Sequence, residues 1–255
     1  MHTLSAARRC AQFAVATVLV AAALLLPTRA DAQTTTYPTR YTQRPLTLGS
    51  AMLRIDASAI YTHRAGPPAE TFGLDVGLGV GLTPDLELGA VFLPLQLAPE
   101  FDYQRPSVYL MGRFVRGTAE VAARGSVTIP TSDSEDALIE VGLPILIHLG
   151  QSARLDLGAF LQLETADPLR WWVRFPVALT INVSPRLVLG PYAAFRVRLD
   201  APGNQIPLGF LVAYTIGGGT GSPVGDVGGQ FQFDDVTGSA GNWSLALVTR
   251  WFLYL

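Results

Sequence analysis

The chain has 255 residues, of which 49% are hydrophobic and only 15% are charged, whereas about a quarter of the residues of a typical soluble protein are charged. All 18 basic residues are arginine, so there is no lysine for a P-loop or for a Schiff base with a pyridoxal cofactor. The net charge of −2 gives no general attraction to nucleic acid, and one cysteine forms neither an intrachain disulfide nor a cysteine-rich zinc site. We therefore predict no cofactor, no metal centre and no nucleic-acid partner.

The first 32 residues have the features of a cleaved secretory signal peptide. Arg8 and Arg9 precede an apolar run of 14 residues, Phe13–Leu26, and the small residues at 30–32 suit signal peptidase. The run is shorter than the roughly 20 residues that span a bilayer, which disfavours a retained membrane anchor. After cleavage, residues 33–47 form a polar stretch, which we predict to be a flexible periplasmic leader or a short plug of the domain that follows, residues 48–255.

Within residues 48–255, apolar residues recur at every second position, which is the pattern of β-strands. We predict twelve strands, near residues 49–62, 71–82, 86–96, 106–116, 118–129, 138–149, 154–164, 170–182, 187–199, 207–216, 227–236 and 243–255. Most of these segments are 10 to 13 residues long, whereas ordinary strands average about five or six residues and a tilted membrane-crossing strand needs about 9–11. The strand near 227–236 has the weakest pattern, so ten strands is the alternative count.

The connections between these strands alternate in length. Tight turns at 83–85, 116–117, 150–152 and 184–185 alternate with longer polar loops, which is typical of an outer-membrane barrel. The glycine-rich stretch 217–229 breaks this pattern as a long connection on the short-turn side. The predicted fold is all-β: a transmembrane, antiparallel, up-and-down β-barrel, closed because every backbone polar group in hydrocarbon must be paired. A secreted soluble β-protein is the alternative.

Aromatic and proline residues refine this prediction. Aromatic residues lie near strand ends, as interfacial girdles do: Tyr61, Phe72, Phe92, Trp171, Trp172 and Trp243 toward the loop side, and Trp251 toward the turn side. Four prolines lie within predicted strands, where each removes a hydrogen bond from the ladder: Pro94, Pro144, Pro176 and Pro191. They mark either bulges or strand ends that lie elsewhere.

Two segments resemble a known family. The segment 44–48, RPLTL, leads into a first strand that ends at Tyr61, and the segment 80–89 reads VGLTPDLELG. Together they resemble small Gram-negative outer-membrane barrels, in particular the phenol-degradation meta-pathway family of channels. The resemblance covers about the first quarter of the mature chain. It implies an outer-membrane location and passage of small compounds, and it supplies no catalytic residues.

Charged residues on the inward face divide into two groups. Arg54, Asp56, Asp75 and Glu87 are predicted to project inward from the first three strands, and Arg174, Arg186, Arg196 and Arg198 from the strands near 170–182 and 187–199. The tight turn at 184–185 is expected to place Arg174 opposite Arg196, with Glu164 as the nearest acid, although directly opposed like charges are unfavourable. Two interpretations stay open: an arginine wall that contacts anionic groups of a permeant solute, or an internal network of ion pairs that fills and rigidifies a closed barrel.

The leading functional prediction is a pore for passive passage of small solutes, anionic or organic, across the bacterial outer membrane. A closed structural barrel without transport is the alternative. A membrane-embedded lipid-modifying enzyme is a third possibility and disfavoured, because the mature chain has only His63 and His148, expected about a barrel height apart. The predicted partners are outer-membrane lipids and, during biogenesis, periplasmic chaperones and the barrel-assembly machinery.

Overall fold

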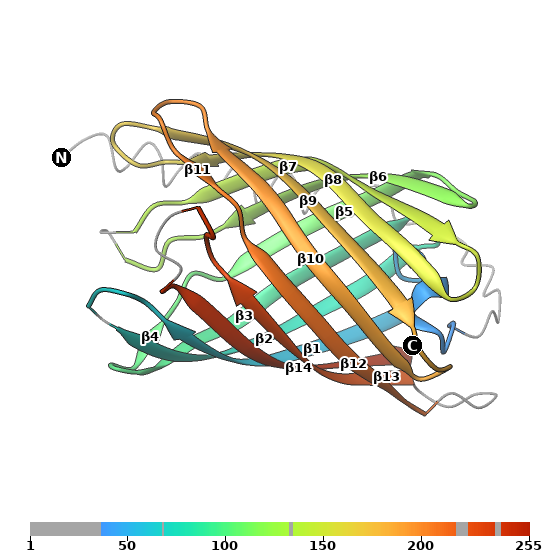
Figure 1. Ribbon diagram of the computed structural model, residues 1–255. Coiled ribbons are helices and arrows are strands. Elements are labelled where there is room, and N and C mark those ends of the chain that lie inside the picture. Colours follow the sequence, from blue (N-terminus) through green and yellow to red (C-terminus); the bar gives the residue numbers. More distant parts are fainter. Residues whose placement is uncertain (1–36, 68, 133–134, 218–223, 238–240) are drawn as a thin grey trace.

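The computed structural model describes residues 37–67, 69–132, 135–217, 224–237 and 241–255, so the predicted signal peptide lies outside the described residues. The described chain forms one antiparallel barrel of twelve long strands (Figure 1). These strands are β1 (Met52–His63), β2 (Glu70–Thr83), β3 (Leu86–Ala98), β5 (Ser107–Val115), β6 (Ala119–Thr128), β7 (Leu138–Leu149), β8 (Ala153–Glu164), β9 (Arg170–Asn182), β10 (Leu187–Arg198), β12 (Leu208–Gly217), β13 (Val224–Phe233) and β14 (Trp243–Tyr254). Two short strands, β4 (Asp102–Tyr103) and β11 (Asn204–Gln205), extend the loop-side end, and a 3₁₀ helix, η1 (Tyr41–Gln43), precedes β1.

The barrel is closed by its first and last strands. β1 pairs with β2 on one side and with β14 on the other, in a register that runs without interruption from Met52 opposite Tyr254 to His63 opposite Trp243. The predicted all-β barrel of twelve strands is therefore confirmed. The short turns, the C-terminus and η1 lie at one end of the barrel, and β4 and β11 lie at the other (Figure 1). We call the first end the turn side and the second the loop side.

The eleventh predicted strand is present but starts earlier than expected. β13 begins at Val224 rather than near residue 227, so the long glycine-rich connection predicted at 217–229 is wrong in extent. Gly225, Gly228 and Gly229 belong to this strand, and neighbouring groups approach the backbone of the first two closely. A Cβ on Gly228 would lie 2.4 Å from the carbonyl oxygen of Val212, and one on Gly225 would lie 2.4 Å from the ring of Trp251. Glycine therefore permits close packing here and does not mark a loop.

The strand prolines are accommodated by short gaps in single ladders. Pro144 has a partner on β8, but the β6–β7 ladder skips it. Pro176 is paired with β10 and skipped by β8, and Pro191 is paired with β12 and skipped by β9. Pro94 pairs with Asp75 close to a register shift between β2 and β3. Because each proline lacks only one N–H, the strands continue through all four positions.

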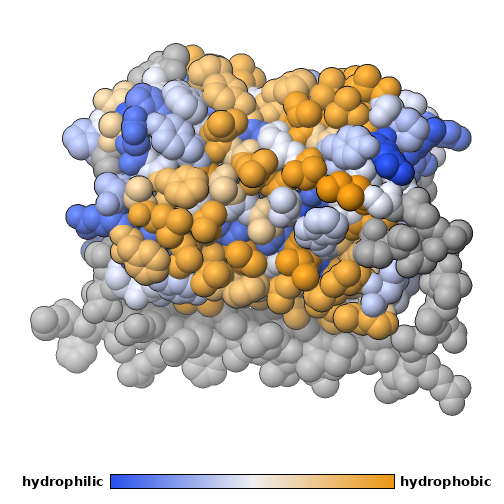
Figure 2. Space-filling model, turned by 90° about the horizontal axis from the view of Figure 1, so that it is seen from below, coloured by the Kyte–Doolittle hydropathy of each residue, from blue (hydrophilic) through white to orange (hydrophobic). Residues whose placement is uncertain are grey.

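Apolar side chains cover the outside of the barrel. Alternate residues of single strands are exposed and apolar, such as Leu245, Leu247 and Trp251 on β14. Figure 2 shows hydrophobic surface across the middle of the molecule, with hydrophilic surface toward its two ends. A soluble barrel would expose its polar face instead, so this surface is suited to lipid. Trp172 is the exception among the predicted girdle residues: it faces the lumen and lies under the guanidinium of Arg196.

Candidate pore lumen

The acidic group predicted on the first strands is neutralised within the barrel. Arg54 binds Asp56 (Nε–Oδ2 2.7 Å) and Glu87 (Nη1–Oε1 3.1 Å). Arg250 on β14 binds the second oxygen of Asp56 at 2.7 Å, and the hydroxyl of Tyr109 donates to Glu87. Two arginines thus offset two carboxylates. The contacts on this wall are therefore those of an internal network of ion pairs, the second of the two interpretations of the charged residues.

Asp75 stands apart from this network. Among the described residues it forms no hydrogen bond or ion pair, and it lies on β2, six long strands around the barrel from β9. Asp75 is eight residues from the turn-side end of β2 at Thr83, and Arg174 is eight residues from the turn-side end of β9 at Asn182. An acidic and a basic side chain therefore occupy opposite walls at similar depth.

The arginine wall has the predicted opposition of like charges. Arg174 and Arg196 are direct partners in the β9–β10 ladder. Arg174 binds Glu140 on β7 (Nη2–Oε2 2.9 Å), whereas the one acceptor of Arg196 in the described part of the chain is the amide oxygen of Gln205, at 3.3 Å. Glu164, expected as the nearest acid, pairs with Arg170 instead. The wall therefore has one carboxylate for two opposed guanidinium groups.

The other two predicted arginines lie at the ends of β10. Arg198 binds Asp200 in the loop beyond the strand, at 2.7 Å. Arg186 was predicted to project inward from a strand; it lies outside the strand, in the β9–β10 turn, one residue before β10 begins at Leu187, and it is exposed there. The hydroxyl of Ser184 accepts the backbone N–H groups of Arg186 and Leu187, which extends the turn by one residue.

Arg124 belongs to the same wall and was missed by the sequence analysis. Arg124 on β6, Gly142 on β7, Phe160 on β8 and Arg174 on β9 are successive ladder partners, so they form one row that continues to Arg196 on β10. The guanidinium of Arg124 lies 4.7 Å from the ring centroid of Tyr109. The alternation of β6, with Ala123 and Gly125 on the outer face, is the signal that places Arg124 inside.

Residues 37–48 cross the turn-side end of the barrel and contact its inner wall. Arg44 is 3% exposed and binds Asp226 on β13 with both Nη atoms, and Thr215 with Nη2. The backbone N–H of Leu46 donates to Glu120, and that of Leu48 to Glu87, each at 2.9 Å. A small polar cavity of about 180 Å³ lies between this segment and the wall. We call residues 37–48 the N-terminal segment.

Further contacts attach the N-terminal segment to the other half of the wall. Thr42, which is fully buried, donates its backbone N–H to Asn182 at 3.0 Å, and its carbonyl oxygen lies 2.8 Å from Nδ1 of His148. Arg154 donates to the carbonyl oxygen of Arg44 at 3.1 Å. The segment therefore has partners on eight strands, β3, β6, β7, β8, β9, β12, β13 and β14, which lie around most of the opening.

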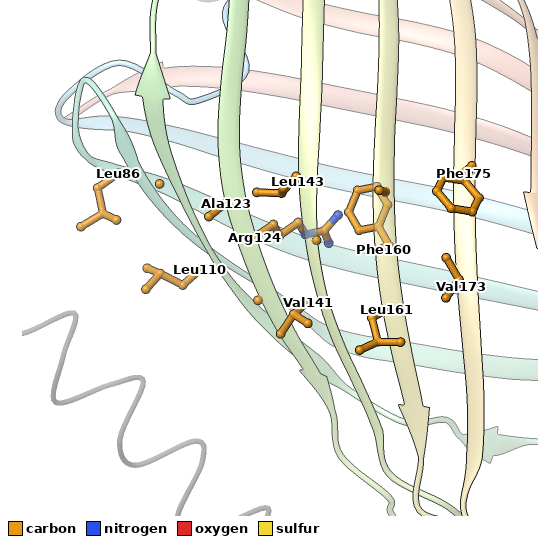
Figure 3. Close-up of a pocket in the computed structure, with 14 residues that line it drawn as sticks. Leu86, Leu110, Ala123, Arg124, Val141, Leu143, Phe160, Leu161, Val173 and Phe175 are labelled. Carbon is orange, nitrogen blue, oxygen red and sulfur yellow. The ribbon is translucent and has the colours of Figure 1, made fainter. Parts of the chain in front are cut away.

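A second hollow, of about 800 Å³, lies on the barrel wall over β3 and β5–β9 (Figure 3). Most of the side chains that line it are apolar, including the exposed Leu143, Val141 and Phe175. Small residues such as Ala123 leave the wall thin there, and Arg124 and Phe160 of the inner row also contribute to the lining. Because these exposed side chains belong to the lipid-facing surface, we expect acyl chains to fill the hollow. It offers few groups that would bind a polar solute.

A closed β-barrel with an apolar outer face and a charged lumen is the architecture of porins and related channels. Solved structures of such proteins are similar to this chain. The KdgM porin is 6% identical and has a TM-score of 0.54, with 77% of this chain and 98% of that chain covered. The NanC porin is 6% identical with a TM-score of 0.57, covering 76% and 98%. An outer membrane channel from Pseudomonas putida F1 is 11% identical with a TM-score of 0.55, covering 82% and 97%. The chain therefore has the fold of outer-membrane porins and channels.

No family model matches the sequence, and no curated protein matches it. The similarity thus lies in the fold rather than in the sequence. No helix among the described residues is long and apolar enough to span a membrane. Within the same residues no group of three or more potential metal ligands is present.

Proposed function

We propose that this protein is a pore for passive passage of small solutes across the outer membrane. The observation that carries the proposal is the division of side chains between the two faces of a closed barrel. The outer face carries exposed apolar residues, while the inner face carries nearly all the strand arginines and their acids. Charged side chains inside a membrane protein are costly and typically line a solute path.

The N-terminal segment sets the width of this pore at the periplasmic end. Its contacts with eight strands support the interpretation as a short plug rather than a flexible leader. Backbone groups of Leu46 and Leu48 are held by carboxylates of the wall, so the segment is attached along its length. In this proposal, solutes pass beside the segment or after it is displaced.

The closed structural barrel is the second candidate, and the ion pairs around Arg54 and Asp56 favour it, because a network of this kind rigidifies a lumen. A lipid-modifying enzyme has less support. His148 contacts Thr42 and Glu120 at the turn side, whereas His63 stacks on Trp243 at the loop side. The described residues therefore place these two histidines at opposite ends of the barrel.

The proposal extends to location and partners. The alternation of apolar and polar residues along the strands implies that the barrel contacts outer-membrane lipids. Its biogenesis implies export by means of the predicted signal peptide, followed by contact with periplasmic chaperones and the barrel-assembly machinery. The segments 44–48 and 80–89 support membership of the phenol-degradation meta-pathway family. One similar structure is of KdgM in complex with disordered oligogalacturonate, which agrees with a small anionic solute as one candidate for this chain.

Planar-bilayer recording with purified, refolded protein tests the proposed function. We expect stepwise conductance in KCl from preparations that contain a heat-modifiable barrel on gels. Absence of steps, with the barrel intact by that criterion, would favour the structural candidate. Boiled protein from the same preparation is the control for contaminating channels.

A further inference from the structure

The arginines of the membrane-spanning strands are not equally compensated. Arg54, Arg113, Arg154, Arg170, Arg174, Arg198 and Arg250 each have a carboxylate oxygen within 4.0 Å. Arg124 and Arg196 have none among the described residues. Both lie in the row that contains Arg174, so this one row holds three guanidinium groups and is served by a single carboxylate, that of Glu140.

Unpartnered polar atoms gather on the same wall. The buried side-chain atoms without a hydrogen-bond partner in the described chain are Nε of Arg124, Arg174 and Arg196, Oε1 of Gln162 and Oγ1 of Thr180. All five residues belong to β6, β8, β9 and β10. A buried polar group without a partner is costly, so folded proteins keep such groups mainly where water or a ligand completes them.

Aromatic rings hold these guanidinium groups in place. Arg124 lies over Tyr109, Arg174 over Phe160 at 4.8 Å and Arg196 over Trp172 at 4.3 Å, measured from Cζ to ring centroid. Stacking on a ring leaves the edge of a guanidinium, where its N–H groups lie, free to face a ligand. A planar guanidinium edge matches the two oxygens of a carboxylate.

The opposition of Arg174 and Arg196 specifies the charge of the ligand. Directly opposed residues on antiparallel strands have Cα atoms about 4.5–5.5 Å apart, so the two guanidinium groups repel each other. Glu140 offsets one charge of three, which leaves an excess of two in the row. A ligand with two or more negative charges removes this excess, whereas a monovalent anion removes half of it.

From this row we infer a binding site for small organic acids with two or three carboxylates, formed by Arg124, Arg174 and Arg196 inside the barrel. The inference rests on the proposed pore function, since the site lines the path that solutes take. It names the substrate class of that pore. A transient site in the lumen raises the local concentration of such acids and favours their entry over that of cations.

Calorimetric titration of refolded protein in detergent with citrate tests the site without relying on conductance. The substitution Arg196→Gln removes one charge and keeps a group that can bond to Gln205. We expect it to weaken citrate binding about tenfold to a hundredfold, the range for loss of a hydrogen bond to a charged group. Arg186→Gln, in the exposed turn, is the matched control and is expected to leave binding unchanged.

Arg196→Lys separates charge from geometry. Lysine keeps the positive charge but lacks the planar fork, so the preference of the pore for chloride over potassium should persist while the affinity for citrate falls. A merely structural arginine would give equal citrate affinity in all variants that fold, and that result would overturn the site. Conductance without citrate binding would also overturn the site, but it would leave the proposed pore function intact. Citrate binding without conductance would support the site and would count against the pore function.

Discussion

The attachment of the N-terminal segment gives the sharpest test of how the barrel is closed at its periplasmic end. Arg44 and Asp226 form an ion pair whose side chains are 3% and 8% exposed. Removing one partner of a buried pair typically costs about 3–5 kcal/mol, because the other charge stays buried and uncompensated. At about 1.4 kcal/mol per factor of ten, Arg44→Ala should shift the equilibrium between attached and detached segment by roughly a hundredfold to several thousandfold.

Single-channel conductance and trypsin sensitivity report this shift. We expect Arg44→Ala to raise the mean conductance severalfold and to expose the peptide bond after Arg40 to trypsin while the barrel stays intact. Asp226→Asn tests the same pair from the barrel side and leaves the segment unchanged. Gln43→Ala removes one hydrogen bond to the carbonyl of Gly150 at the surface, worth about 0.5–1.5 kcal/mol, and is the control. Equal conductance and equal cleavage in all of these variants would refute the reasoning.

Three further outcomes are expected. Glu140→Gln removes the one carboxylate that serves the arginine row within the described chain, so the reversal potential in a KCl gradient should shift toward that of chloride. Leu247→Arg, on the lipid face of β14, should cost about 2–4 kcal/mol in urea titrations in liposomes, whereas Ala246→Arg, one residue away and facing inward, should cost less. The hydrogen bond from Arg198 lowers the pKa of Asp200 to about 2. The contact of Asp200 with the Trp171 amide is therefore complete above about pH 4 and lost as the pH falls through about 2, which an NMR titration of that amide would show.

The strands could be predicted from the sequence because their signal is local. Alternation over 10 or more residues defines both the strand and its buried face, and β14 ends within one residue of its predicted end. The opposition of Arg174 and Arg196 was predictable for the same reason, since a short turn between them sets the register of β9 and β10. The boundary of that turn depends on the hydroxyl of Ser184, which accepts the backbone N–H of Arg186, and no local pattern in the sequence places Arg186 before the strand rather than within it.

The contacts across the lumen could not be predicted, because no local pattern encodes them. Arg44 and Asp226 are 182 residues apart, and their meeting depends on the path of the N-terminal segment into the barrel. Glu140 reaches Arg174 from two strands away, whereas Glu164, closer in sequence, lies nearer the loop side and meets Arg170. Such pairs follow from the registers of several ladders together and from the reach of long side chains.

The sign of the net charge is a poor guide to what the lumen attracts. The chain as a whole carries −2, yet acids such as Glu100, Asp102 and Asp167 are exposed at the loop side, where salt screens them. Among the described residues inside the barrel, most carboxylates are already bound to arginine, and the charges left over are the carboxylate of Asp75 and the guanidinium groups of one row on the opposite wall. A partly enclosed charge is screened much less than an exposed one, so in the proposed pore we expect these few residues, rather than the larger number of acids outside, to set the preference among ions.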